Sequence, residues 1–117
     1  MSAASTIREV VSSWQGIREA PGNFGAVEFR LGKREIGHLH GNAWIDVPFP
    51  RAVRDELVGS GGAEPHHILP QSGWVTFRVH SAGDADPAVA LLRRSYDLVV
   101  AQLARRKRQS VSAKTSA

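Results

Sequence analysis

Hydrophobic residues recur at spacings of three and four in three stretches of the chain, which is the pattern of amphipathic helices. These stretches cover residues 6–16, 51–59 and 87–107. In two other stretches, residues 24–31 and 74–80, hydrophobic and polar residues alternate, as is typical of half-buried strands. The presence of both periods predicts a chain that combines helices with a sheet.

Two glycine-led pairs between the first strands predict tight turns. Residues 32–33 and residues 41–42 each fit a two-residue hairpin turn with glycine in the first position. In the resulting three-stranded meander, Arg30 lies opposite Glu35, so opposite charges meet on one face. This agreement between turn and charge pattern supports the predicted register.

The register decides where the histidines of the middle strand point. Two-residue turns pair His38 with Val27 and with Ile45. The imidazoles of His38 and His40 are then expected to point toward the apolar core. A three-residue loop at either turn would reverse the faces of the following strand, and with them this expectation.

These elements predict an α+β fold with two layers. A mainly antiparallel sheet of four to five strands is expected to carry three helices packed on one face. Residues 1–108 are expected to form a single domain, which suits a chain of 117 residues. The small polar residues of 109–117 predict a disordered tail.

Composition narrows the classes of protein to consider. Hydrophobic residues make up 42% of the chain and charged residues 22%, as in globular proteins. The absence of cysteine excludes disulfides, thiolate metal ligands and cysteine nucleophiles. Neither a signal-peptide pattern nor an apolar run of membrane-spanning length is present, so we expect a cytoplasmic protein without membrane contact.

The net charge of +4 is concentrated near the C-terminus. Residues 105–117 contain five of the 15 basic residues and none of the 11 acidic ones. The central cluster consists of Arg105, Arg106, Lys107 and Arg108. We interpret this cluster as a solvated helix end whose cations favour the helix dipole. The alternative is weak contact with nucleic-acid phosphates, which no other part of the sequence favours.

Five motifs occur in an order that resembles a known family. They are Glu35–His40, Asp46–Pro50, His66-His67, Ser72-Gly73-Trp74, and Leu91-Leu92 with Ser95-Tyr96. Together they resemble the luciferase-domain proteins, a small and mostly uncharacterised group. The resemblance covers more than half of the chain and implies no mechanism. The chain has no flavin or nucleotide fingerprint and is too short for the (β/α)₈ barrel of flavin-dependent luciferases.

The C-terminal half also resembles the YjbR-type domain, a compact α+β fold with a suggested link to DNA binding. The residues concerned are Trp74–Phe77, Ser95–Val99 and the basic end. The N-terminal half departs from that pattern, notably in its His-x-His. This second resemblance therefore implies the α+β architecture but no DNA-binding role.

Two histidines that are two residues apart on a strand share a face, which suits metal ligation. His38 and His40 are candidate metal ligands together with His67, and His66 or Glu64 are other sources of a third ligand. Three such ligands and a water would form a hydrolytic or hydration-type site. We favour a structural interpretation, in which the imidazoles hydrogen-bond within the fold and fix the strand register.

The opposite face of the sheet is expected to carry Trp44, Trp74 and Arg78. Trp and Arg are enriched in the residues that dominate binding energy at interfaces. This face therefore predicts either a platform for a ligand or a surface that a helix, or a second copy in a homodimer, covers.

We conclude from the sequence that the chain is a small binding domain for a small molecule or a protein partner. Its site is expected where the strand with His38 and His40 meets Ser72-Gly73-Trp74 and residues 63–70, a short extended segment that contains His66 and His67. The candidate binding residues are His38, His40, His66, His67, Trp44, Trp74 and Arg78. A metal-dependent enzyme is the first alternative, and a nucleic-acid-associated module that uses the basic cluster is the second. The sequence names no catalytic residue and no cofactor, and leaves open whether the protein is an enzyme.

Overall fold

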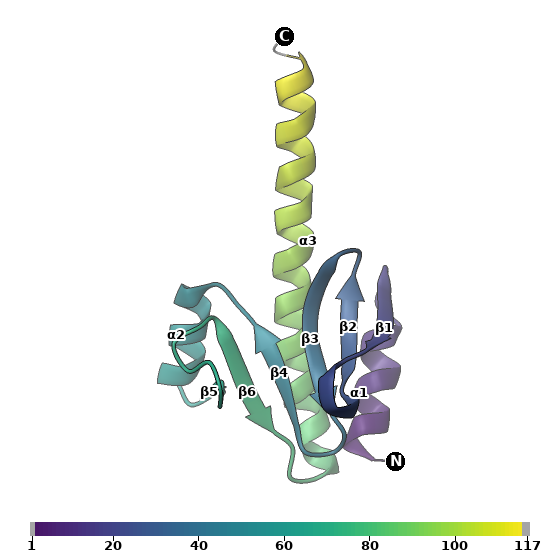
Figure 1. Ribbon diagram of the computed structural model, residues 1–117, viewed down its shortest axis with the longest axis vertical. Helices are drawn as coiled ribbons and strands as arrows, with labels where there is room; N and C mark the ends of the chain where they lie inside the picture. Colours follow the sequence, from purple (N-terminus) through teal and green to yellow (C-terminus); the bar gives the residue numbers. More distant parts are fainter. Residues whose placement is uncertain (1, 116–117) are drawn as a thin grey trace.

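The computed structural model describes residues 2–115, with side chains described as far as Val111 (Figure 1). The three helices are α1 (Ala3–Ser12), α2 (Arg51–Gly59) and α3 (Ala85–Thr115). The six strands are β1 (Ile17–Pro21), β2 (Val27–Leu31), β3 (Arg34–His40), β4 (Trp44–Pro48), β5 (Glu64–Pro65) and β6 (Trp74–Arg78). A short 3-10 turn, η1 (Asn23–Gly25), connects β1 to β2.

The strands form one antiparallel sheet in the order β1-β2-β3-β4-β6-β5. This confirms the α+β class and the antiparallel sheet, but the sheet has six strands where the sequence predicted four to five. The additional strand is β1, an edge strand without a regular apolar alternation. Its sequence, IREAP, therefore carried none of the pattern by which the other strands were identified.

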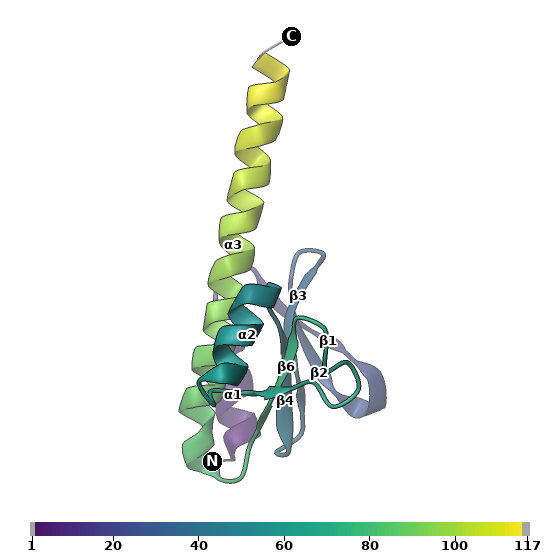
Figure 2. The same ribbon diagram turned by 90° about the vertical axis from the view of Figure 1, so that its left-hand side faces the viewer.

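Figure 2 shows the three helices on the same side of the sheet. The core lies between the layers, where Ile7 and Val11 of α1 and Leu92 of α3 are fully buried. From the sheet, the core receives Phe29, Ile36, Leu39, Ile45, Val47 and Val75. The other face of the sheet is left without a helix, and this is the face that carries the candidate site.

The register that the sequence predicted for β2 and β3 is only half right. Leu31 and Arg30 pair as predicted, with Arg34 and Glu35. Beyond them the register shifts, so that Phe29 lies opposite Gly37 instead of Ile36. The cause is a β-bulge, which adds one residue to β3 and changes the faces of the residues that follow.

Gly37 makes this bulge possible. Its φ of 154° lies in a region that residues with a side chain rarely adopt, and a Cβ there would meet Leu92 at 2.5 Å. Because of the bulge, Ile36 and Leu39 are both in the core, although strict alternation places residues three apart on opposite faces.

The second predicted turn is wrong. His40 pairs with Trp44 and His38 with Asp46, so the loop contains three residues, 41–43, rather than two. The amide of Ala43 donates to the carbonyl oxygen of His40 at 3.0 Å, which closes the loop. The prediction that the imidazoles point into the apolar core is also wrong. The bulge at Gly37 turns His38 and His40 to the opposite face of the sheet, and the three-residue loop places Trp44 beside His40 on that face.

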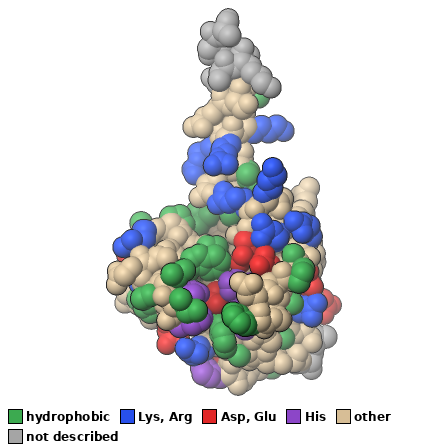
Figure 3. Space-filling view, viewed as in Figure 1, with side chains coloured by type: hydrophobic (Ala, Val, Ile, Leu, Met, Phe, Trp, Pro, Cys, Tyr) green, Lys and Arg blue, Asp and Glu red, His purple; other side chains and the backbone are tan. Residues whose placement is uncertain are grey.

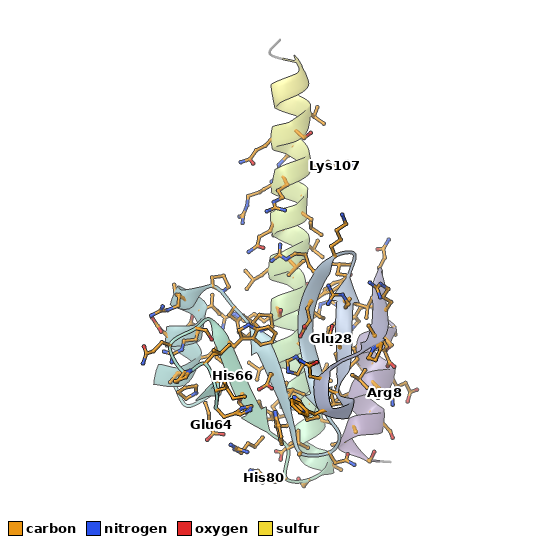
Figure 4. The ribbon with its side chains drawn as sticks, in the orientation of Figure 1. Arg8, Glu28, Glu64, His66, His80 and Lys107 are labelled. Atoms are coloured by element: carbon orange, nitrogen blue, oxygen red, sulfur yellow. The ribbon has the colours of Figure 1, made fainter. Side chains whose placement is uncertain are left out.

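Helix α3 is longer than its hydrophobic pattern predicted. A helix was expected over 87–107 and a disordered tail over 109–117, whereas α3 continues to Thr115 and the last two residues lie outside the described part. Its C-terminal half projects beyond the sheet and carries the basic cluster, in which Lys107 is labelled in Figure 4. Among the described residues, no helix combines the length and apolar character needed to cross a membrane.

Candidate functional site

A pocket of about 590 Å³ lies on the helix-free face of the sheet. Its floor comes from β3 and β4, one wall from η1 and the other from the loop that follows β5. The residues that line it are Asn23, Phe24, Gly25, His38, His40, Gly41, Trp44, Asp46, His66, His67 and Ile68. Figure 3 shows histidine and hydrophobic side chains gathered on this face. The pocket therefore combines polar groups on its floor with an apolar side chain in each wall, Phe24 in one and Ile68 in the other.

Asp46 of β4 is the polar centre of the pocket. Its side chain is only 1% exposed, and its Oδ1 accepts a hydrogen bond of 2.7 Å from the hydroxyl of Thr76. Its Oδ2 accepts a hydrogen bond of 3.1 Å from the indole N–H of Trp44. Hydrogen bonds from Thr76 of β6 and from Trp44 of β4 thus fix the orientation of the carboxylate.

Three imidazoles approach the same oxygen of Asp46. The Nε2 atoms of His38, His40 and His66 lie 3.0, 3.3 and 3.7 Å from Oδ2. The first two histidines come from β3, and the third comes from the loop after β5, which is why no local sequence pattern joins them. Figure 4 labels His66 near β5 and β6.

His38 lies between two carboxylates. In addition to its contact with Asp46, its Nδ1 lies 2.7 Å from Oε2 of Glu35. Burial by itself would lower the pKa of His38, but the hydrogen bonds to Asp46 and Glu35 outweigh it and raise the pKa to about 9. Burial would likewise raise the pKa of Asp46, but the hydrogen bonds from His38, Thr76 and Trp44 lower it to about 2. At neutral pH the metal-free site therefore holds an imidazolium against a carboxylate.

His40 and His66 are held in the neutral form. Burial lowers the pKa of both, and the neighbouring charge of His38 lowers that of His40 further. The Nδ1 of His66 accepts hydrogen bonds of 3.1 Å from the backbone amides of Ile68 and Leu69. The proton of neutral His66 therefore lies on Nε2, the nitrogen that faces Asp46.

Aromatic rings connect the parts of the pocket. His40 stacks on Trp44 with ring centres 4.5 Å apart, and His66 stacks on His67 at the same distance. Trp44 also meets His67 edge to face at 5.7 Å. These contacts hold the loop after β5 against the floor of the pocket.

The structure brings most of the sequence-predicted site residues together. His38, His40, His66, His67 and Trp44 all line the pocket. Trp74 lies next to it, with its ring 5.3 Å from that of His38. The exception is Arg78, which forms an exposed ion pair of 3.0 Å with Glu64 and lines a different depression.

Sequence reasoning missed Asp46, Glu35 and Thr76. It also placed the histidines and the tryptophans on opposite faces of the sheet. This is wrong because of the bulge at Gly37 and the three-residue loop at 41–43. One signal could have identified Asp46, since it stands within Asp46–Pro50, a motif used for the family resemblance. An acidic residue between the buried Ile45 and Val47 is expected to face a partner or solvent, and three imidazoles are that partner.

The raised pKa of His38 predicts a loss of stability at alkaline pH. The imidazolium contributes fully below the usual pKa of 6.5, and its contribution is lost as the pH rises through about 9. In chelator-treated protein we expect the melting temperature of the wild type to fall toward that of His38→Gln between about pH 6 and about pH 10. Thermal unfolding monitored by circular dichroism measures this, and parallel curves for the two proteins would contradict it.

Comparison with known proteins supports the family resemblance. A family model described as the luciferase domain matches residues 33–95, which is more than half of the chain. The matched segment contains the whole floor of the pocket and the loop with His66 and His67. Searches of curated proteins and of solved structures returned no match, and the YjbR-type resemblance stays a prediction. From the matched segment we conclude that the chain belongs to the luciferase domain family.

Proposed function

We propose that this luciferase-domain protein binds a small organic molecule in the pocket on the helix-free face. The observation that carries the proposal is the pocket itself, whose volume of about 590 Å³ lies within the range of small-molecule sites. Such sites combine apolar walls with a few convergent polar groups. Here the convergent groups are Asp46 and the imidazoles around it.

The walls of the pocket support a ligand with a flat apolar part. Phe24 is 99% exposed and Ile68 is 70% exposed, although both line the pocket. Phe24 also has a φ of 57°, a left-handed conformation that costs a residue with a side chain roughly 1–2 kcal/mol. A strained and fully exposed phenylalanine at the mouth of a pocket is well explained if its ring covers a bound molecule.

The floor supports a polar group at the inner end of that ligand. Neutral His66 directs an N–H toward the centre of the site, and His40 is also neutral, so both suit a hydrogen-bonding group without a formal charge. A ligand with a flat body and one hydrogen-bonding end would meet the rings of Trp44 and His67 and then these imidazoles. The concave shape favours a small molecule over the flat surface of a protein partner or of a homodimer.

Tryptophan fluorescence tests the proposal. We expect at least one member of a panel of flat, uncharged metabolites to quench the emission of chelator-treated protein and to raise its melting temperature. The quenching is expected to fall strongly in Trp44→Phe, which leaves Trp74 as the tryptophan next to the pocket. It is expected to remain in Trp14→Phe, a matched control, because Trp14 packs on Tyr96 and does not line the pocket.

Phe24→Ala separates binding from folding. Because the side chain is exposed, we expect its removal to change the free energy of unfolding by at most about 0.5 kcal/mol. The same change is expected to weaken ligand binding. A ligand whose affinity is the same for wild type, Phe24→Ala and Trp44→Phe binds elsewhere, and that result, like the absence of any ligand in the panel, would count against the proposal.

A further inference from the structure

We propose that His38, His40 and Asp46 form a three-ligand site for a divalent transition-metal ion that opens into the pocket. The ligand atoms are the two Nε2 atoms and Oδ2 of the aspartate. They all lie within 4.8 Å of one another, and Oδ2 is 3.0 and 3.3 Å from the two nitrogens. Two ligands at about 2.1 Å from a metal lie roughly 3.0–3.4 Å apart, so these spacings fit one ion.

The groups behind the ligands support the site. A histidine that binds a metal through Nε2 normally directs its other nitrogen at a carboxylate or carbonyl, which fixes the ring. Glu35 does this for His38, with Oε2 2.7 Å from Nδ1. Thr76 and Trp44 hydrogen-bond to the two oxygens of Asp46 and fix its orientation in the same way. Glu35, Thr76 and Trp44 thus orient the three ligands from outside. A cluster stabilised only by contacts among the ligands themselves would not require these outer hydrogen bonds.

The tautomer of His66 removes it from the ligand set. Its Nδ1 accepts two backbone N–H groups, so its Nε2 carries the proton and has no lone pair for a metal. His67, which the sequence suggested as the third ligand, groups with Asp46 and His66 rather than with the histidines of β3. The third ligand that the structure offers is therefore the carboxylate of Asp46.

Two imidazoles and one carboxylate define the class of metal. This set with open positions is typical of divalent iron and of neighbouring first-row ions, rather than of calcium or magnesium. The ion takes the place of the proton that His38 Nε2 directs at Asp46 in the metal-free protein, and that proton leaves to solvent. Neutral His40 binds as the tautomer with its proton on Nδ1, so that its Nε2 offers a lone pair. The remaining positions of the ion face the pocket, since all three ligand residues line it.

Titration with metal alone tests this site without any organic ligand, so its outcome is independent of the function proposed above. Full-length protein without a polyhistidine tag is stripped with a chelator and then titrated with Zn²⁺ by calorimetry and with Co²⁺ by visible absorption. We expect a single ion per chain. We expect Glu35→Gln to weaken binding by about 10- to 100-fold, and His40→Ala to weaken it further.

His66→Gln is the matched control, because it removes an imidazole from the same cluster without removing a ligand. Its affinity for Zn²⁺ is expected to stay within about threefold of the wild type, which is far less than the loss of an outer partner costs. Circular dichroism verifies the fold of each variant, and both His40 and Glu35 lie at partly exposed positions. Absence of a stoichiometric ion, or an equal loss of affinity in His66→Gln and His40→Ala, would overturn the proposal.

Discussion

Gly73→Ala is expected to lower the free energy of unfolding by about 3 kcal/mol, since it forces the backbone to move. A Cβ at this position would lie 2.0 Å from the carbonyl oxygen of Phe49. The two residues are also hydrogen-bonded, with the amide of Phe49 donating to the carbonyl of Gly73 at 3.1 Å. The glycine of Ser72-Gly73-Trp74 is thus explained by a close approach of two backbones.

Gly59→Ala is the control for this prediction. Gly59 lies at the end of α2, has an ordinary φ and has no atom within 4 Å of the added Cβ. Alanine there is expected to be neutral or to stabilise by up to about 1 kcal/mol. Urea unfolding monitored by circular dichroism gives both values. Similar midpoints for the two variants would show that the close approach to Phe49 does not limit the fold.

Asp46→Ala is expected to cost about 3 kcal/mol in chelator-treated protein, because it breaks a buried ion pair and removes an acceptor. The imidazolium of His38 keeps only Glu35 as a partner. The hydroxyl of Thr76 and the indole N–H of Trp44 lose the acceptor that they share. The penalty arises from these unpaired groups more than from the loss of the carboxylate itself.

Asp97→Ala is the matched control, since it also removes a carboxylate from an ion pair. Asp97 lies 3.1 Å from Arg93 one turn away on α3, and both side chains are more than half exposed. Its loss is expected to change stability by no more than about 0.5 kcal/mol. If chemical denaturation gave equal costs for the two variants, the central role of Asp46 in the fold would be refuted.

Much of the fold could be predicted because its elements follow simple periods. The spacing of Val89, Leu92, Tyr96 and Val99 identified α3, and the alternation around Val75 identified β6. β1 could not be found in this way, since an edge strand has few buried positions to produce a pattern. The end of α3 was also missed, because its C-terminal half projects from the body (Figure 1) and its side chains over 105–110 are all polar and exposed.

The site was harder to predict, because it depends on which face of the sheet each side chain of β3 occupies. One added residue at Gly37 and a third residue in the loop at 41–43 change which side chains share a face. Either event was enough to reverse a conclusion drawn from alternation. The convergence of His38, His40 and His66 was expected from the sequence, but the carboxylate between them was not.

The hydrogen bonds of Asp46 have a consequence for how this family can diversify. The carboxylate joins β4 to β3 through His38 and to β6 through Thr76, so three adjacent strands depend on one side chain. A substitution of Asp46 would change the polar groups of the pocket and weaken the sheet at the same time. Phe24 and Ile68 at the mouth of the pocket are exposed, so substitutions there do not weaken the sheet in this way. For the ligand binding proposed above, we thus expect new preferences to arise by substitution at the mouth, while the inner polar groups are retained.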